Sequence, residues 1–194
     1  MNDRLKKQLD FFIELDKMKN LYRQTYILHE NRKENDAEHS WHIAVTAFLF
    51  AEYANKALDI NKVVKMLLLH DVVEIDAGDT YCYDAAGNST KSEREEKAAE
   101  RLFGLLPDDQ KKEFYGLWRE FEDSRTDEAR FAAMIDRIQP LLLNYTKDGI
   151  SWKEHDVYKD QVLGRNTDYF KESDELANLI TTVINDAAEK GWLK

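Results

Sequence analysis

The sequence predicts an all-α protein, a single domain built as a helical bundle of about seven helices. Turn formers are scarce, since the 194 residues include only 7 Gly and 2 Pro, which favours long helices over turn-rich β architecture. Apolar residues recur at helical spacing along most of the chain, and no segment shows a convincing strand alternation. Because no break in composition marks a second domain, residues 1–194 are interpreted as one unit with one core.

Helical periodicity in the first half predicts helices over about residues 3–18, 36–57 and 61–77. Asp36 can cap the second of these helices, which places His39 in its first turn. Asn61 can cap the third, and Gly78 closes it. Residues 79–89 contain clustered turn formers and are expected to form a loop long enough to carry substrate contacts.

The second half predicts four further helices, which begin near residues 90, 108, 126 and 168. Pro107 separates the first two, and Thr126 opens the third in a capping pattern. Pro140 is expected to bend that third helix near its middle. Residues 146–166 are mixed in character, and one short helix is expected there, before the last helix over about residues 168–190.

Bulk properties exclude several classes of protein. The formal charge of −10 argues against a nucleic-acid polymer as partner, although a metal and a few basic groups can still attract a small anion. Cys82 is the single cysteine, so no internal disulfide can form, and it is interpreted as a bystander. No signal peptide or membrane span is recognised, so we expect a cytoplasmic protein without a membrane partner. The amphipathic first and last helices are compatible with a homodimer, although such stripes more often pack within one chain.

One short segment concentrates polar chemistry in an apolar context. In LLLHDVVEIDAGD, His70 and Asp71 are adjacent near the end of the third predicted helix, with Glu74 one turn later and Asp79 past the helix end. Burying such groups without a partner costs several kcal/mol, so their charge needs compensation. A divalent cation would supply it.

Such a cation needs further ligands from elsewhere in the chain. His39 at a helix start and Asp136 inside the apolar run FAAMIDRIQPLLLNY stand in suitable contexts. Imidazole nitrogen and carboxylate oxygen together suit Mn, Co, Fe, Zn or Ni more than Ca, with Mg as a further candidate. Taken alone, His39 is also compatible with a solvated or capping residue, and Asp136 with an ion pair to Arg137.

These residues together resemble the HD-domain metal-dependent phosphohydrolase superfamily, whose pattern is H…HD…D. The matching segments are AEHSWHIAV, LLLHDVVEIDAGD and MIDRIQPLLLNY, and the resemblance extends over about residues 18–145, with 146–194 as a C-terminal extension. Within the superfamily the chain is most similar to the small group of 5′-deoxynucleotidases and their hydrolase relatives. The resemblance implies one divalent metal held by four ligands, His39, His70, Asp71 and Asp136.

The same resemblance implies roles for four other residues. Glu74 matches the acid that handles the attacking water or the leaving group, and Asp79 matches a second acid. Arg23 matches an arginine that contacts the nucleotide, where its planar fork suits phosphate. The family often has Trp soon after this arginine, whereas this chain has RQTYI, which leaves Tyr26 as a substitute ring.

The sequence also favours one chemistry within the superfamily. Binuclear relatives add histidines between the HD pair and the final Asp, and residues 72–135 contain none, which favours a mononuclear hydrolase. The expected activity is a phosphomonoesterase in which a metal-activated water attacks a nucleoside or deoxynucleoside 5′-monophosphate. Two alternatives remain: a non-catalytic regulator that binds a nucleotide or metal, and a hydrolase of another phosphate ester such as guanosine tetraphosphate.

Five further polar or aromatic residues stay outside the predicted site. His42 lies one turn after His39 and is interpreted as a non-ligand. Four others in the C-terminal third are interpreted as packing or surface residues, namely Trp152, His155, Arg165 and Asn166.

Overall fold

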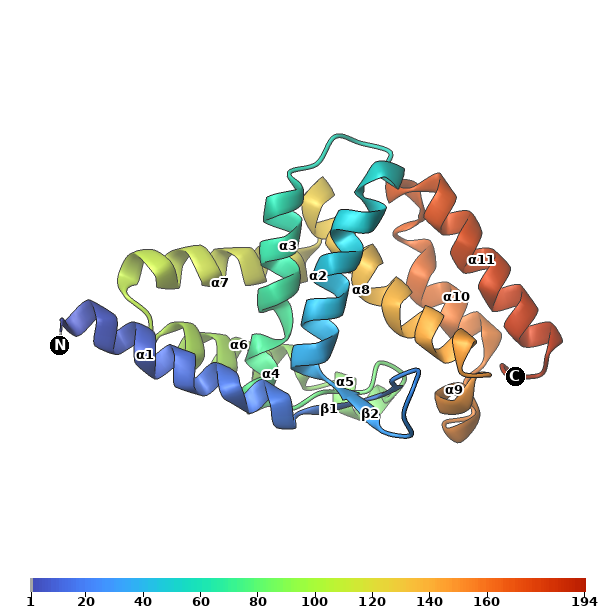
Figure 1. Ribbon diagram of the computed structural model, residues 1–194, viewed down its shortest axis with the longest axis horizontal. Coiled ribbons are helices and arrows are strands. Elements are labelled where there is room, and N and C mark those ends of the chain that lie inside the picture. The colour runs from blue at the N-terminus through green and yellow to red at the C-terminus, as the bar shows by residue number, and fades with distance from the viewer. Residues whose placement is uncertain (1) are drawn as a thin grey trace.

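The computed structural model describes residues 2–194 and confirms the all-α class (Figure 1). Within these residues, eight helices have nine residues or more: α1 (Asp3–Leu15), α2 (Asp36–Phe50), α3 (Ile60–Leu69), α6 (Lys91–Phe103), α7 (Asp108–Asp123), α8 (Asp127–Thr146), α10 (Lys159–Thr167) and α11 (Asp174–Glu189). Three others have four or five residues: α4 (Glu74–Ala77), α5 (Ala85–Asn88) and α9 (Ile150–Glu154). In the described residues no helix is both long and apolar enough to cross a membrane.

Helices α2, α3 and α8 pack together at the centre of the molecule (Figure 1). Their buried apolar residues form one large cluster with those of α11, and α10 and α11 lie on the C-terminal side. A second cluster joins α1, α6 and α7 on the other side, around Phe11, Phe103 and Trp118. The segment that carries the HD pair contributes Val72 and Val73 to this second cluster, so its polar residues are anchored between two cores.

A short antiparallel hairpin corrects the expectation that the chain has no strand. Strand β1 (Tyr22–Tyr26) pairs with β2 (Lys33–Asn35). The fully buried positions of the two strands are Thr25 and Glu34 rather than apolar residues. Because the inward face is polar, the period-2 hydrophobic signal is missing from the sequence.

The third predicted helix is broken at the HD pair. Helix α3 ends at Leu69, residues His70–Val73 form a 3₁₀ helix, and α4 follows up to Gly78, whose φ of +78° suits glycine. The ring Nδ1 of His70 lies 2.9 Å from the carbonyl of Leu67, which the end of α3 leaves without an α-helical partner. The break therefore fixes the His70 ring as well as the backbone.

Two helix starts are also corrected. Asn35, not Asp36, caps α2. The Asn35 side chain accepts a hydrogen bond from the backbone N–H of Glu38, and the Glu38 side chain accepts one from the backbone N–H of Asn35, which makes a capping box. Helix α3 is capped by Asp59 rather than Asn61. The expected cap of α8, Thr126, is confirmed. Asp36 is thus free of capping and lies fully buried beside the site.

The C-terminal third contains more structure than expected. Helices α9 and α10 replace the single short helix, and the last helix begins at Asp174 rather than near residue 168. The predicted loop over residues 79–89 contains α5. Helix α8 is continuous through Pro140. Since proline has no amide hydrogen, the carbonyl of Asp136 lacks its usual partner four residues on.

Candidate functional site

Four side chains from three segments meet between α2, α3 and α8. His39 comes from the first turn of α2, His70 and Asp71 from the 3₁₀ helix, and Asp136 from α8. The Oδ1 atom of Asp136 lies 2.9 Å from His39 Nε2 and 3.5 Å from His70 Nε2. Asp71 Oδ1 lies 3.0 Å from His70 Nε2, and Asp71 Oδ2 lies 3.9 Å from His39 Nε2. The structure thus brings all four predicted metal ligands together.

Both histidine rings present the same nitrogen to this cluster. His39 Nδ1 lies 3.0 Å from Gln139 Oε1, and His70 Nδ1 lies 2.9 Å from the Leu67 carbonyl. Because both partners are acceptors, each Nδ1 carries the hydrogen, and each Nε2 of a neutral ring keeps its lone pair. His70 Nε2 is buried without a hydrogen-bond partner. Two lone pairs aimed at carboxylates need a cation between them, so the donor set fits a metal ion.

The charges of the cluster are strongly linked. Burial by itself lowers the pKa of His70, but the negative charges of Asp71 and Asp136 outweigh it and raise that pKa well above its ordinary value. Burial by itself raises the pKa of Asp136, but the two histidines hold it well below its usual range. In the metal-free protein, protonated His70 pairs with Asp71 and Asp136 and so stabilises the fold at low pH. This stabilisation is lost as pH rises through the pKa that His70 has in the folded protein. A metal would replace the proton there.

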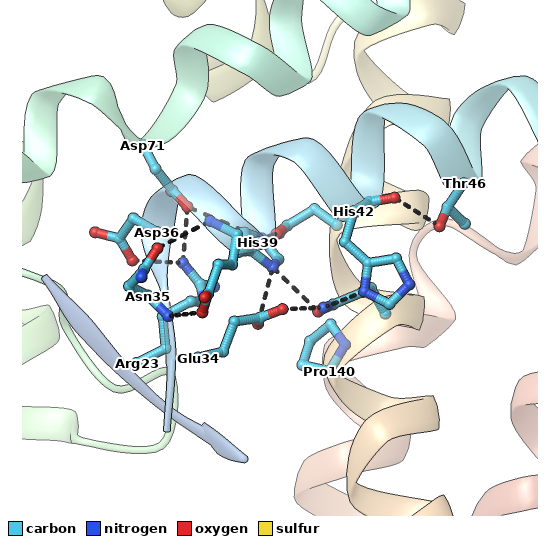
Figure 2. Close-up of polar contacts among 12 residues, drawn as sticks. Arg23, Glu34, Asn35, Asp36, His39, His42, Thr46, Asp71 and Pro140 are labelled. Carbon is cyan, nitrogen blue, oxygen red and sulfur yellow. Dashed lines mark hydrogen bonds and ion pairs between the residues drawn. The ribbon is translucent and has the colours of Figure 1, made fainter. Parts of the chain in front are cut away.

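A second group of side chains, which includes Arg23 and Asp36, contacts the cluster at Asp71 (Figure 2). Arg23 from β1 places Nη1 2.7 Å from Asp71 Oδ2, 3.4 Å from Asp36 Oδ1 and 4.0 Å from Asp79 Oδ1. Carboxylate oxygens of Asp36, Asp71 and Glu74 lie within 4.8 Å of one another. One guanidinium therefore balances several carboxylates, which explains why they can be buried together.

Three of these carboxyl groups hold protons more tightly than usual, and burial together with the charge of Asp71 raises the pKa of the first, Asp36, to about 7. Burial and the charge of Asp71 raise the pKa of Glu74 well above its ordinary value, against the opposing charge of Arg23. Burial also raises the pKa of Asp79, again opposed by Arg23. Glu74 Oε2 is buried without a hydrogen-bond partner. Acids with such shifts in a cavity are suited to proton transfer.

A cavity of about 210 Å³ opens onto the cluster, and most of the predicted site residues line it. They are Arg23, His70, Asp71, Glu74, Asp79 and Asp136. Tyr26 is not among the lining residues. Its hydroxyl instead donates to Glu154 Oε1 at 2.9 Å, and the neighbours of Arg23 that line the cavity are Gln24 and Thr25.

The sequence did not reveal several residues that support the cluster. Gln139 accepts from His39, and its amide nitrogen contacts Glu34 Oε1 at 2.6 Å and His42 Nδ1 at 3.0 Å. Figure 2 shows Glu34 directed at the His39 ring, on the side opposite Asp71. Gln139 follows Asp136 by three residues and shares its helix face, which is the one signal that could have identified it. His42 contacts this amide rather than the metal ligands.

The cavity also contains basic and C-terminal residues that sequence reasoning left out. Lys91 lines it from α6 and pairs with Glu95 at 3.4 Å. Trp152, Arg165 and Asn166 line it as well, so their interpretation as packing or surface residues was incomplete. The fourth residue of that set, His155, packs against Tyr81 and is not part of the lining. No local motif marks these residues, because they reach the cavity from separate helices.

A helical fold that joins an H…HD…D cluster to one cavity defines a class of protein. Residues 15–177 match the model of the HD domain family, so the chain belongs to that family. Among curated relatives, human 5′-deoxynucleotidase HDDC2 is 32% identical over 111 residues, which cover 57% of this chain and 53% of the human protein. The Xenopus laevis 5′-deoxynucleotidase HDDC2 is 31% identical over 138 residues, covering 71% of this chain and 67% of the relative. The chain thus spans about half to two thirds of these relatives.

Solved structures agree with this assignment. A predicted metal-dependent phosphohydrolase from Magnetospirillum magnetotacticum MS-1 superimposes with a TM-score of 0.91 at 48% identity, and the match covers 99% of both chains. An HD-domain phosphohydrolase from Listeria innocua superimposes with a TM-score of 0.64 over 89% of this chain and 97% of the other. At 18% identity, that second likeness supports the fold alone.

Proposed function

We propose that this protein is a metal-dependent phosphomonoesterase that hydrolyses nucleoside and deoxynucleoside 5′-monophosphates. The observation that carries the proposal is one cavity lined by three of the four metal-ligand candidates, His70, Asp71 and Asp136, together with Glu74, Asp79 and Arg23. The fourth candidate, His39, lies directly behind this wall, in contact with Asp136. Similarity to proteins named 5′-deoxynucleotidase and metal-dependent phosphohydrolase supports the substrate and the reaction class.

The metal would be held by His39, His70, Asp71 and Asp136. Their mixed nitrogen and oxygen donors suit Mn, Co, Fe, Zn or Ni, with Mg as a further candidate. When bound, such a cation lowers the pKa of a water molecule toward neutrality and neutralises charge on a phosphoryl oxygen. The Nδ1 bonds described above keep both imidazoles oriented for it.

Arg23 is assigned to the phosphate. Its side-chain hydrogen bonds in the described residues both use Nη1, which leaves Nη2 and Nε to bind phosphoryl oxygens as a planar fork. It approaches from β1, on the side of the cluster where Asp36 and Asp79 lie.

Glu74 and Asp79 are assigned to proton transfer. Glu74, whose pKa is raised by burial and by Asp71, acts in its protonated form and donates its proton to the ester oxygen that leaves when the phosphorus–oxygen bond breaks. Asp79 acts in its ionised form, which the charge of Arg23 favours, and accepts the proton that the attacking water loses as the new phosphorus–oxygen bond forms. The products are a nucleoside and inorganic phosphate, and the next proton exchange with solvent restores both acids.

Phosphate release tests this proposal directly. Protein loaded in turn with Mn²⁺, Co²⁺ and Mg²⁺ is expected to release phosphate from deoxynucleoside 5′-monophosphates, and chelation is expected to stop it. Bis(p-nitrophenyl) phosphate, a diester, is the control substrate and should react far more slowly. If metal-loaded protein releases no phosphate from any monophosphate, the enzyme proposal is wrong and the non-catalytic regulator becomes the better interpretation.

We also propose that the protein self-associates through α1 and α2. The apolar stripe of α11 packs inside the chain, but those of α1 and α2 face outward. The exposed side chains share the spacing of one helix face, and they are Leu5, Leu9, Phe12 and Ile13 on α1 and Trp41, Val45, Phe48 and Leu49 on α2. Exposed apolar side chains in such number are typical of an interaction surface, and a stable interface buries roughly 800 Å² per partner.

The double variant Phe48→Asp/Leu49→Asp is expected to be monomeric. These two side chains are 58% and 63% exposed, so acidic replacements disturb little inside the chain but oppose burial between chains. Light scattering coupled to size-exclusion chromatography measures the mass. The control Leu179→Asp, on the exposed side of α11, should keep the mass of the parent protein, and a parent mass near 22.8 kDa would contradict the proposal.

A further inference from the structure

The cavity continues from the metal ligands along one face of α8. Asp136, Pro140 and Asn144 follow one another on this face at helical spacing, and all three line the cavity. At a rise of ~1.5 Å per residue, Asn144 lies ~12 Å further along the helix than Asp136. A phosphate group alone cannot span that length, so the far part of the cavity is available for the rest of the substrate.

Asn144 offers an unused acceptor in this far part. Its side chain is buried, and Nδ2 donates to the carbonyl of Pro140 at 3.0 Å, which fixes the orientation of the amide. The remaining atom, Oδ1, is buried and has no hydrogen-bond partner. Buried polar atoms are nearly always paired in folded proteins, so an orphaned acceptor in a cavity wall points to a donor on a ligand.

Arg165 and Tyr81 offer unused donors in the same cavity. Arg165 reaches it from α10, and within residues 2–194 no carboxylate lies within 4.0 Å of its guanidinium, although the chain carries a net charge of −10. The hydroxyl of Tyr81 is buried without a hydrogen-bond partner. Tyr81 also lines the cavity, and its ring packs against His155 directly after α9, with 4.5 Å between the ring centroids.

The combination of donors and an acceptor decides which chemistry fits. A second phosphate or a carboxylate would satisfy Arg165 and Tyr81 but would place negative charge beside the Oδ1 atom of Asn144. A neutral ring that carries both donors and acceptors satisfies all three. Guanine presents two adjacent acceptors, O6 and N7, that match an arginine fork, and its N1 and N2 hydrogens match an amide oxygen.

We propose that Arg165, Asn144 and Tyr81 form a base-recognition subsite that selects guanine at the far end of the cavity. Arg165 donates to O6 and N7, Asn144 Oδ1 accepts from the N1 or N2 hydrogens, and Tyr81 donates to a remaining acceptor of the nucleoside. The inference rests on the proposed nucleotidase function only in placing the phosphate of the nucleotide at the metal ligands. A bidentate arginine–guanine pair gives a preference of about 10- to 100-fold over other bases.

Kinetics with four substrates test the preference. The parent protein is expected to show a kcat/KM for dGMP about 10- to 100-fold above those for dAMP, dCMP and dTMP. Arg165→Met and Arg165→Lys both remove the fork, so each should lower kcat/KM for dGMP to the level of the others, mainly through KM. The control Arg125→Met changes an arginine whose side chain is 82% exposed and should leave all four values unchanged. Equal parent values for all four bases would overturn the subsite.

Binding of the nucleoside separates the subsite from the reaction. Calorimetric titration should show that deoxyguanosine binds more tightly than deoxyadenosine, and that Arg165→Met and Asn144→Leu each remove the difference. If phosphate is released but deoxyguanosine binds no better than deoxyadenosine, the subsite is wrong and the nucleotidase function stands. If no phosphate is released but deoxyguanosine binds selectively through Arg165, the function is wrong and the subsite stands. Tighter binding of deoxyguanosine 3′-monophosphate than of deoxyguanosine, lost in Arg165→Met, would instead identify a second anion site and overturn the guanine assignment.

Discussion

Asp71→Ala is expected to abolish metal binding and to lower kcat/KM by about 10³-fold or more. The reason is geometric, because Asp71 places one carboxylate oxygen near each histidine Nε2, at 3.0 Å from His70 and 3.9 Å from His39. Losing it removes an anionic ligand from a four-residue set. A catalytic metal supplies several kcal/mol of transition-state stabilisation, and each ~1.4 kcal/mol corresponds to a factor of ten.

Metal content by mass spectrometry and thermal unfolding measure this loss separately from activity. Parent protein should bind one equivalent of Mn²⁺ or Co²⁺ with a rise in Tm, and Asp71→Ala should bind none and show no rise. Arg23 keeps Asp36 and Asp79 as neighbours in the variant, so the fold should persist. Asp71→Asn, which preserves size, checks this point.

Asp76→Asn is the matched control for the metal. Asp76 lies five residues further along the same segment and pairs with Arg101 outside the cavity. It should retain full metal content. If Asp71→Ala binds metal as well as Asp76→Asn does, the assignment of Asp71 as a ligand is wrong.

Helical periodicity predicts most of this fold because the core faces of α7, α8 and α11 are apolar stripes. It fails where polar groups replace that stripe. The hairpin escapes notice because its inward residues include Glu34 and Arg23, which serve the cluster rather than the core. The break at His70 escapes notice for a related reason, since the side chain of His70 satisfies a backbone carbonyl that a continuous helix would have used. Departures from local pattern thus coincide with the site.

The candidate site divides in the same way. The metal ligands form a motif of fixed residue types, so the sequence could predict which residues to bring together. The far wall of the cavity has no such motif, because Arg165 and Asn144 line it from two different helices, α10 and α8. The resemblance offered Tyr26 as a substitute for the ring that the family often has after this arginine. In the structure its hydroxyl donates to Glu154, and Tyr26 does not line the cavity.

Glu74→Gln is expected to retain metal and to lower kcat by about 10²- to 10⁴-fold, the range typical of a lost general acid. Glu74 belongs to the carboxylate group beside the metal ligands, but it is not part of the His39–His70–Asp136 cluster. Glutamine preserves its volume and removes the proton that the leaving oxygen needs. Metal content and KM should therefore remain near parent values, whereas kcat falls.

The pH profile gives the sharper measurement. A general acid acts only while protonated, and the pKa of Glu74 is raised by burial and by Asp71, so parent activity should fall as pH rises through that pKa. The alkaline limb should disappear in Glu74→Gln. Glu95→Gln is the matched control, because burial raises the pKa of Glu95 to about 7 and it lines the same cavity, but it pairs with Lys91 rather than facing the metal ligands. Metal loss in Glu74→Gln equal to that in Asp71→Ala would make Glu74 a ligand. An unchanged alkaline limb would assign the proton donor to another group, with Asp79 the next residue to replace.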